Sequence, residues 1–246
     1  MASTIRITYF CKKTNTMKFG VITFPGSNCD QDLIYVLETI MGYEVERLWH
    51  KETSIKGADF IVLPGGFSYG DYLRSGAIAN YSPIMKEVIA HAESGGYVMG
   101  ICNGFQILCE SKLLPGTLLH NNHQKFTCKN VFLKADNNAS LINQGVGLDE
   151  VLNIPIAHAE GRFFVPDDLL SKIEHNNQVI YRYCDADGNV TEEANPNGTL
   201  NNIAGVCNEG RNVFGMMPHP ERAADIELGN TDGLRILESL VSEVVA

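Results

Sequence analysis

A cysteine on a predicted turn is the residue of this sequence whose surroundings most favour chemistry. Cys102 lies between an apolar run typical of a buried strand, 97–101, and a segment over 105–113 whose apolar residues repeat at helical spacing. Gly100 and Gly104 flank it, as in the nucleophile elbow of hydrolases that carry serine at this position. A helix that begins beside the sulfur offers free N–H groups that stabilise negative charge on it. The pattern predicts a nucleophilic cysteine, and the alternative is a buried cysteine on a tight turn.

A catalytic cysteine needs a base, and the base needs a group that orients it. Among the seven histidines, His219 follows an apolar strand pattern at 213–217, and side chains at the carboxyl ends of strands line the sites of α/β proteins. Pro218 and Pro220 favour extended backbone around it. In an extended segment residues two apart point the same way, so Glu221 can hold one imidazole nitrogen and leave the other as the base. The alternative is a turn that opens a short helix.

Two adjacent glycines provide candidate donors to an oxyanion. Gly65 and Gly66 come just after another predicted strand, 60–63, so their N–H groups can approach a substrate with no side chain in the way. The backbone N–H of Asn103, next to the cysteine, is the natural second donor. Taken alone, a tight strand-to-helix turn explains the glycine pair equally well.

Strand and helix patterns alternate through the first half of the chain, which predicts a mostly parallel sheet covered by helices on both faces. The second half is richer in turns and alternating strands, which predicts antiparallel additions at the sheet edge. No repeat, low-complexity tract or linker interrupts the chain, so we expect one α/β domain built as a three-layer sandwich. The predicted strands are 18–24, 44–49, 60–63, 97–101, 125–133, 151–159, 178–183, 203–207 and 213–217, and the predicted helices are 30–41, 83–92, the segment after Cys102, 167–173 and 233–245.

The bulk composition argues against several classes of protein. The formal charge of −10 and the pI near 5.1 offer no basic stripe for nucleic acid. No apolar run approaches the roughly 18 residues that a membrane span needs. The seven cysteines are scattered without a C-x-x-C pair, which suggests neither a metal site nor a disulfide framework and favours a reducing, cytoplasmic location.

The first sixteen residues precede a second methionine, Met17, at the start of the first strand pattern. They lack the sustained apolar segment of a secretory signal. We expect 1–16 to be a vector-derived leader or the result of a start assigned upstream of Met17, with a transit peptide as the alternative. The folded domain is then expected to span 17–246.

Five segments of the chain, in this order, resemble the class I (triad-type) glutamine amidotransferases. Within that class they are most similar to the small glutaminase subunits of phosphoribosylformylglycinamidine synthases. The resemblance runs from about Met17 to the C-terminus, and the run FSYGD at 67–71 separates these subunits from other members of the class. The segments are 24–30 (FPGSNCD), 64–71 (PGGFSYGD), 102–106 (CNGFQ), 158–163 (HAEGRF) and 217–222 (MPHPER).

The resemblance implies a flavodoxin-like glutamine amidotransferase fold and a thioester mechanism. Cys102 would attack the side-chain amide of glutamine, and His219, oriented by Glu221, would transfer the protons. The N–H groups of Gly66 and Asn103 would hold the oxyanion. The residues expected around the bound glutamine are Gly65, Phe67, Gln106 and Glu160.

The resemblance also implies partners. Ammonia would pass to a separate, much larger ATP-dependent synthetase subunit that converts formylglycinamide ribonucleotide to formylglycinamidine ribonucleotide in purine synthesis. A small accessory subunit would complete the complex. ATP and magnesium are expected on the synthetase, and no cofactor or metal is expected in this chain.

Two other functions stay open at this point. The first is another cysteine hydrolase on a similar sheet, such as a γ-glutamyl hydrolase or a protease-like relative. The second is a non-catalytic scaffold, which has no reason to keep a cysteine, a histidine and a glutamate together.

Three other segments also have alternative interpretations. Residues 26–28 are interpreted as a plain turn more than as an anion-binding loop. Residues 158–160 either supply backbone to the glutamine site or turn the chain. Residues 68–74, rich in interface-type side chains, are interpreted as a docking surface for the synthetase.

Overall fold

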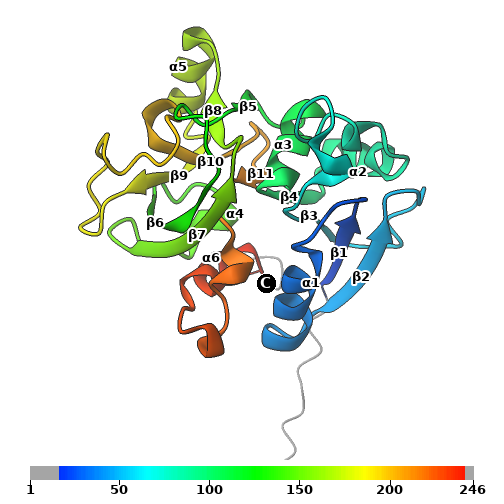
Figure 1. The fold of residues 1–246 in the computed structure, drawn as a ribbon. Coiled ribbons are helices and arrows are strands. Elements are labelled where there is room, and N and C mark those ends of the chain that lie inside the picture. Colours follow the sequence, from blue (N-terminus) through cyan, green and yellow to red (C-terminus); the bar gives the residue numbers. More distant parts are fainter. Residues whose placement is uncertain (1–16, 242–246) are drawn as a thin grey trace, which may run out of the picture.

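Residues 17–241 are described by the computed structural model, and a mixed sheet of nine strands runs through them (Figure 1). Its strands are β1 (Lys18–Thr23), β2 (Glu44–Trp49), β3 (Phe60–Leu63), β4 (Tyr97–Ile101), β6 (Thr127–Ala135), β7 (Val151–His158), β9 (Val179–Cys184), β10 (Ile203–Cys207) and β11 (Val213–Met216). Their order is β2-β1-β3-β4-β11-β10-β9-β6-β7. Neighbours from β2 to β11 pair in parallel, and those from β11 to β7 pair antiparallel. A separate antiparallel pair joins β5 (Thr117–Leu119) to β8 (Arg162–Phe164).

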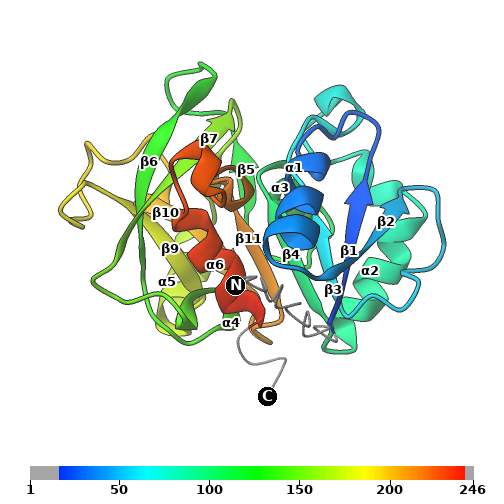
Figure 2. The same ribbon diagram turned by 90° about the horizontal axis from the view of Figure 1, so that it is seen from below.

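Helices cover both faces of the parallel part of the sheet. The α-helices are α1 (Asp30–Tyr35), α2 (Ile84–Glu93), α3 (Asn103–Glu110), α4 (Leu141–Gln144), α5 (Asp167–His175) and α6 (Asp232–Val241). The connection from β1 to β2 runs one way along the sheet and those from β3 to β4 to β11 run the other way. Because such crossovers are right-handed, α1 lies on one face and α2 and α3 on the other (Figure 1). Seen from below, α1 and α6 lie in front of the strands (Figure 2).

Short turns of other helix types complete the chain. α1 continues without a break into a π-helix, so the predicted helix over 30–41 changes its hydrogen-bonding pattern near the middle. These short helices are η1 (Val36–Ile40), η2 (Ser68–Asp71), η3 (Ala79–Tyr81), η4 (Leu200–Asn202), η5 (Pro220–Arg222) and η6 (Ile226–Leu228). Among the helices of residues 17–241, none combines the length and apolar character that a membrane span requires.

The predicted α/β class, the helices on both faces and the antiparallel edge are confirmed. The strand predicted over 125–133 begins and ends two residues later in the structure, as β6 (Thr127–Ala135). The residues just before it, 121–124, form a turn in which Gln124 has a positive φ of 57°. β5, β8 and α4 were not predicted, since segments of three or four residues carry no readable periodicity. The predicted leader, 1–16, and the end of the helix predicted over 233–245 lie outside the described residues.

The central strands are buried on both faces, as the apolar runs of a parallel sheet predict. All four residues of β3 are buried, and so are all four of β11.

Because β1, β3, β4 and β11 run in parallel, their carboxyl ends lie at the same edge of the sheet. The loops that follow these four strands carry Cys29, the glycine pair at 65–66, Cys102 and His219.

Close packing of α3 against the sheet depends on two glycines. A Cβ on Gly104 would overlap the carbonyl of Leu63 at the end of β3. A Cβ on Gly100 would lie 2.5 Å from the backbone of Gly104. The helix can therefore start directly at the end of β4 only while both positions lack a side chain. The close packing thus gives a steric reason for the two glycines that flank Cys102.

We expect Gly104→Ala to lower the free energy of unfolding by about 1 to 3 kcal/mol, because the added methyl forces the start of α3 away from β3. Gly147→Ala is the matched control, since a Cβ there would have its nearest neighbour at 3.6 Å. Urea denaturation of both variants measures the difference. Equal stability of the two variants would contradict the close packing described above.

Candidate active site

Cys102 occupies a strained turn between β4 and α3. Its φ of 50° and ψ of −104° are unfavourable for a residue with a side chain, at a cost of about 1 to 3 kcal/mol. The backbone N–H of Cys102 donates to the carbonyl of Met216 at 2.8 Å, which ties the turn to β11. Its sulfur lies 3.8 Å from the carbonyl oxygen of Ala157 in β7. Strain maintained by neighbouring strands at the start of a helix is the geometry predicted for a nucleophile elbow.

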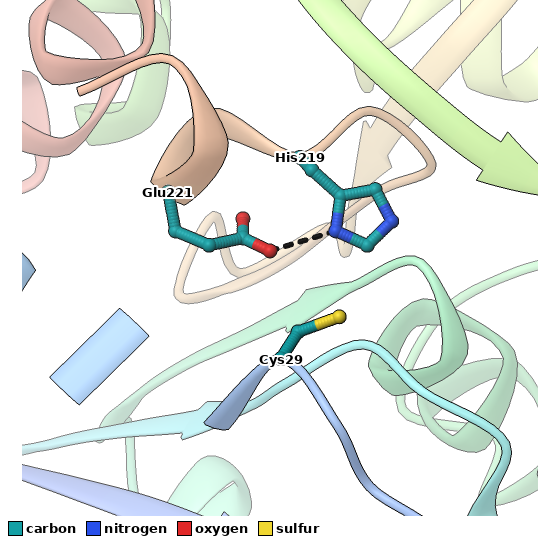
Figure 3. Close-up of side chains that lie close together, drawn as sticks. All are labelled: Cys29, His219 and Glu221. Atoms are coloured by element: carbon teal, nitrogen blue, oxygen red, sulfur yellow. Dashed lines mark hydrogen bonds and ion pairs between the residues drawn. The ribbon is translucent and has the colours of Figure 1, made fainter. Parts of the chain in front are cut away.

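His219 and Glu221 form a buried pair next to this turn. His219 Nδ1 lies 2.7 Å from Glu221 Oε1, and each residue is only 2% exposed. The backbone N–H of His219 donates to the carbonyl of Pro155, so β7 holds the loop from the other side. Figure 3 shows both side chains, with Nδ1 turned to the carboxylate and the other ring nitrogen turned away from it. Glu221 therefore orients the histidine as predicted, but the extended segment predicted for 219–221 is wrong: His219 precedes the short helix η5, and Glu221 reaches the ring from within that turn.

Burial and charge act in opposite directions on the imidazole. Burial disfavours the imidazolium, but the Glu221 carboxylate and the nearby sulfurs of Cys102 and Cys29 outweigh it. The pKa of His219 consequently lies well above its ordinary value, which favours the positively charged ring. Such a charge stabilises a thiolate on a neighbouring cysteine.

A second cysteine, which the sequence analysis did not place in the site, lies against the same histidine. Figure 3 shows the sulfur of Cys29 pointing toward the His219 ring. Arg222 donates to this sulfur at 3.2 Å and to the carboxylate of Asp32 at 3.1 Å. Burial raises the pKa of the Cys29 thiol, although His219 and Arg222 act against the shift. One signal in the sequence could have found Cys29: it follows the first predicted strand and so belongs to the same sheet edge as Cys102.

Cys29, Cys102 and His219 line a common cavity of about 160 Å³. Phe67 was predicted here, whereas Phe126 from the turn before β6 was not. The rings of Phe67 and Phe126 are 6.4 Å apart and both are about half exposed, so they form the rim. The lining residues are Asn28, Cys29, Gly66, Phe67, Cys102, Phe126, Ala157, His219 and Arg222.

The predicted oxyanion loop lies directly beside the cavity. A Cβ on Gly65 would lie 2.6 Å from Cε1 of His219, and one on Gly66 would lie 2.7 Å from the backbone of Ser27. Gly66 also has a φ of 142°, which residues with side chains rarely adopt. Asn103 is the first residue of α3, so its N–H has no partner within the helix. Gly66 lines the same cavity as Cys102, and Asn103 directly follows Cys102 in the chain; their action on an oxyanion stays a prediction.

Gln106 and Glu160 are placed differently from Phe67. The amide of Gln106 donates to the carbonyl of Glu160 at 2.7 Å and accepts from Asn103 at 2.8 Å. The Glu160 carboxylate lies 3.2 Å from His120. In the described part of the chain, neither Gln106 nor Glu160 lines the cavity at Cys102. Their predicted contacts with substrate stay predictions, and the side chain of Gln106 is seen here holding the loop that carries Glu160.

The neighbouring histidine, His158, has a structural environment. It is buried at the end of β7, and its Nε2 lies 3.1 Å from Asn197. Burial, with the charge of His219 adding to it, lowers the pKa of His158 to about 3. A neutral imidazole that packs at a chain turn fits the interpretation of 158–160 as a turn.

The segment 68–74 divides into an inner and an outer part. Tyr69 faces inward, and its hydroxyl bonds His50 at 2.6 Å and Ser82 at 2.9 Å. Tyr72 and Leu73 face solvent and are 70% and 82% exposed. Side chains this large and apolar rarely stand exposed together without a partner.

The arrangement fits acyl transfer through a cysteine. Cys102 has the strained turn, the helix start and the adjacent imidazole that a nucleophile needs, whereas burial disfavours the thiolate of Cys29. The His219–Glu221 pair supplies the base and its orienting carboxylate. The intact set argues against the non-catalytic scaffold.

Comparisons with known proteins specify the family. The family model of the CobB/CobQ-like glutamine amidotransferase domain matches residues 16–231. The phosphoribosylformylglycinamidine synthase subunits PurQ of Moorella thermoacetica and Koribacter versatilis are 55% and 53% identical to the chain over 92% of its length, covering 95% and 97% of their own. The structure of PurLQS from Thermotoga maritima matches with a TM-score of 0.82 and 41% identity, over 93% of this chain and 99% of that chain.

The imidazolium is expected to control the reactivity of Cys102. In His219→Asn, iodoacetamide should alkylate Cys102 about 10-fold or more slowly at pH 7, because a positive charge beside the sulfur is lost. His175→Asn, on the exposed end of α5, is the control. Mass spectrometry of the labelled peptides gives the rate at each cysteine. An unchanged rate at Cys102 in His219→Asn would show that the ring does not support the thiolate.

Proposed function

The chain belongs to the PurQ family, the glutamine amidotransferase subunits of phosphoribosylformylglycinamidine synthase, and we propose that Cys102, His219 and Glu221 carry out its hydrolysis of glutamine. The observation that carries the assignment is the buried His219–Glu221 hydrogen bond beside a cysteine on a strained turn. These three residues come from the carboxyl ends of adjacent parallel strands, where side chains of different loops converge.

In the first step the Cys102 thiolate attacks the side-chain carbonyl carbon of glutamine. The carbonyl oxygen becomes an oxyanion, which the N–H groups of Gly66 and Asn103 bind in our proposal. Backbone donors fixed before the reaction need no reorganisation as charge develops, which makes this kind of stabilisation a large part of the catalytic effect. The tight contacts around Gly66 support a loop of fixed geometry.

The His219 imidazolium then gives a proton to the departing nitrogen, and ammonia leaves a γ-glutamyl thioester on Cys102. The now neutral ring takes a proton from water, and the resulting hydroxide attacks the thioester carbon. Collapse of this second intermediate releases glutamate and restores the thiolate and the imidazolium. Glu221 keeps its bond to Nδ1 throughout, so the other ring nitrogen serves both proton transfers.

Four further residues are proposed to position the glutamine. Gly65 leaves room for the His219 ring, and Phe67 closes the rim of the cavity. Gln106 and Glu160 are proposed at the end that holds the α-amino and carboxylate groups. Their internal hydrogen bond supports a role in fixing that part of the site.

The ammonia passes to the synthetase subunit, which converts formylglycinamide ribonucleotide to formylglycinamidine ribonucleotide in purine synthesis. A small accessory subunit completes the complex. The exposed side chains of Tyr72 and Leu73 support docking of the synthetase on segment 68–74. We assign the amidotransferase domain to 17–246. We also place the protein in the cytoplasm, because all six cysteines of residues 17–241 are free thiols, which a reducing compartment preserves.

Reconstitution with the synthetase tests the role of Cys102. Cys102→Ala should abolish glutamine-dependent synthesis and leave ammonium-dependent synthesis at the level of the unmodified complex, because only the source of ammonia is removed. Cys128→Ala, an exposed cysteine, should keep both activities. Glutamine-dependent synthesis that survives Cys102→Ala would exclude this mechanism. Accumulation of a γ-glutamyl thioester on Cys102 in the presence of glutamine distinguishes this enzyme from a peptide-directed hydrolase.

Glu221→Gln should lower kcat for glutamine hydrolysis about 100-fold or more, with a smaller change in KM, because an amide cannot hold the charged imidazole in place. Glu227→Gln changes an exposed carboxylate six residues away and serves as the control. Steady-state glutamate release by the assembled complex gives both constants. A kcat within a few-fold of normal in Glu221→Gln would remove Glu221 from the mechanism.

A further inference from the structure

Cys29, His219 and Glu221 bring three different metal-binding groups together in the interior. A sulfur, an imidazole nitrogen and a carboxylate oxygen lie within 4.8 Å of one another, and all three residues are buried (Figure 3). Within residues 17–241 this is the one group of three such side chains close enough to share an ion. The proposed reaction uses His219 and Glu221 but gives Cys29 no step, so the sulfur calls for a separate explanation.

We propose that these three side chains form an inhibitory binding site for Zn²⁺. Zinc is the ion whose usual ligands are a thiolate, an imidazole and a carboxylate, and it accepts water or another ligand as the fourth. Harder ions such as Mg²⁺ and Ca²⁺ prefer oxygen alone and fit this set poorly. Binding releases the proton of the Cys29 thiol and the proton between His219 and Glu221.

The geometry requires only small movements. Ligands of a tetrahedral zinc ion lie about 3.3 to 3.6 Å from one another, given the usual bond lengths. Here Nδ1 of His219 and Oε1 of Glu221 are 2.7 Å apart, so they must separate by less than an ångström, and the sulfur, which lies within 4.8 Å of the other ligand atoms, must approach by at most about 1.5 Å. The second carboxylate oxygen, Oε2, has no hydrogen-bond partner within residues 17–241 and can turn to the ion.

The charges around the site also matter. Arg222 contacts the Cys29 sulfur and opposes a cation, but its guanidinium is shared with Asp32. A thiolate and a carboxylate together neutralise the two charges of the ion. Cys29 also lines the cavity beside Cys102, which gives an ion a way to the sulfur from outside.

Zinc at this position would stop glutamine hydrolysis. It replaces the hydrogen bond that orients His219 and adds positive charge where the imidazolium must form. This inhibition rests on the proposed roles of His219 and Glu221, whereas zinc binding itself does not. The two measurements below therefore fail separately.

The test uses the full chain and titrates ZnCl₂ by calorimetry, with Co²⁺ absorption as a report of metal–thiolate bonding. Cys29→Ala should weaken zinc binding about 10-fold or more and remove the cobalt–thiolate band. Cys102→Ala should bind zinc as the unmodified protein does, and so should the exposed-site control Cys128→Ala. Cys29→Ser, which keeps the size of the side chain, repeats the loss in a variant that preserves the packing.

Inhibition is measured in the assembled complex, with each variant compared with its own rate without zinc. The concentration for half-inhibition should rise about 10-fold or more in Cys29→Ser and stay constant in Cys128→Ala. Zinc affinity that is unchanged in Cys29→Ala, or lost in Cys102→Ala, overturns the proposal. Zinc that binds through Cys29 without slowing glutamine hydrolysis overturns the inhibitory role and leaves the site itself.

Discussion

The close approach of α3 to the ends of β3 and β4 is the constraint on which the site depends. It is possible only because Gly100 and Gly104 lack side chains. The chain must turn within one residue, which forces Cys102 into a positive φ, and Cys102 lines the cavity beside the neighbouring loops. The loops after β3 and β11 lie so close together that a side chain on Gly65 would overlap the ring of His219. A helix start shifted away from the sheet would separate the cysteine from its partners.

Burial of charge gives the site its electrostatic character. A histidine and a glutamate that are both almost fully buried would be costly apart, and they are tolerated because they bond to each other. The His219 ring of this pair lies near the sulfurs of both Cys102 and Cys29, so its charge alone does not distinguish the two cysteines. Cys102 stands at the start of an eight-residue helix on a strained turn, whereas burial disfavours the thiolate of Cys29. Proximity to the histidine alone therefore does not define the nucleophile.

A continuous hydrogen-bond network links the site to the surface. The side chain of Asn103 accepts from the N–H of Ser68 and donates to Gln106, which in turn holds the carbonyl of Glu160. Residues from 69 to 73 that follow Ser68 include several positive φ angles and end in exposed apolar side chains. The residue that carries the proposed oxyanion donor is thus held by the segment proposed as the docking surface.

The sequence by itself determined the elements and the chemistry that follows from local order. Periodicity located the central strands, and short motifs singled out Cys102, His219 and Glu221 as candidates, because an elbow and a His-x-Glu run are properties of a few adjacent residues. The pairing of β11 between β4 and β10, the short strands β5 and β8, and the rim residue Phe126 were decided only by tertiary structure. Cys29 shows the reason most clearly. It lies 190 residues from His219 in the chain, and only the parallel alignment of β1 with β11 through β3 and β4 brings its sulfur to the imidazole.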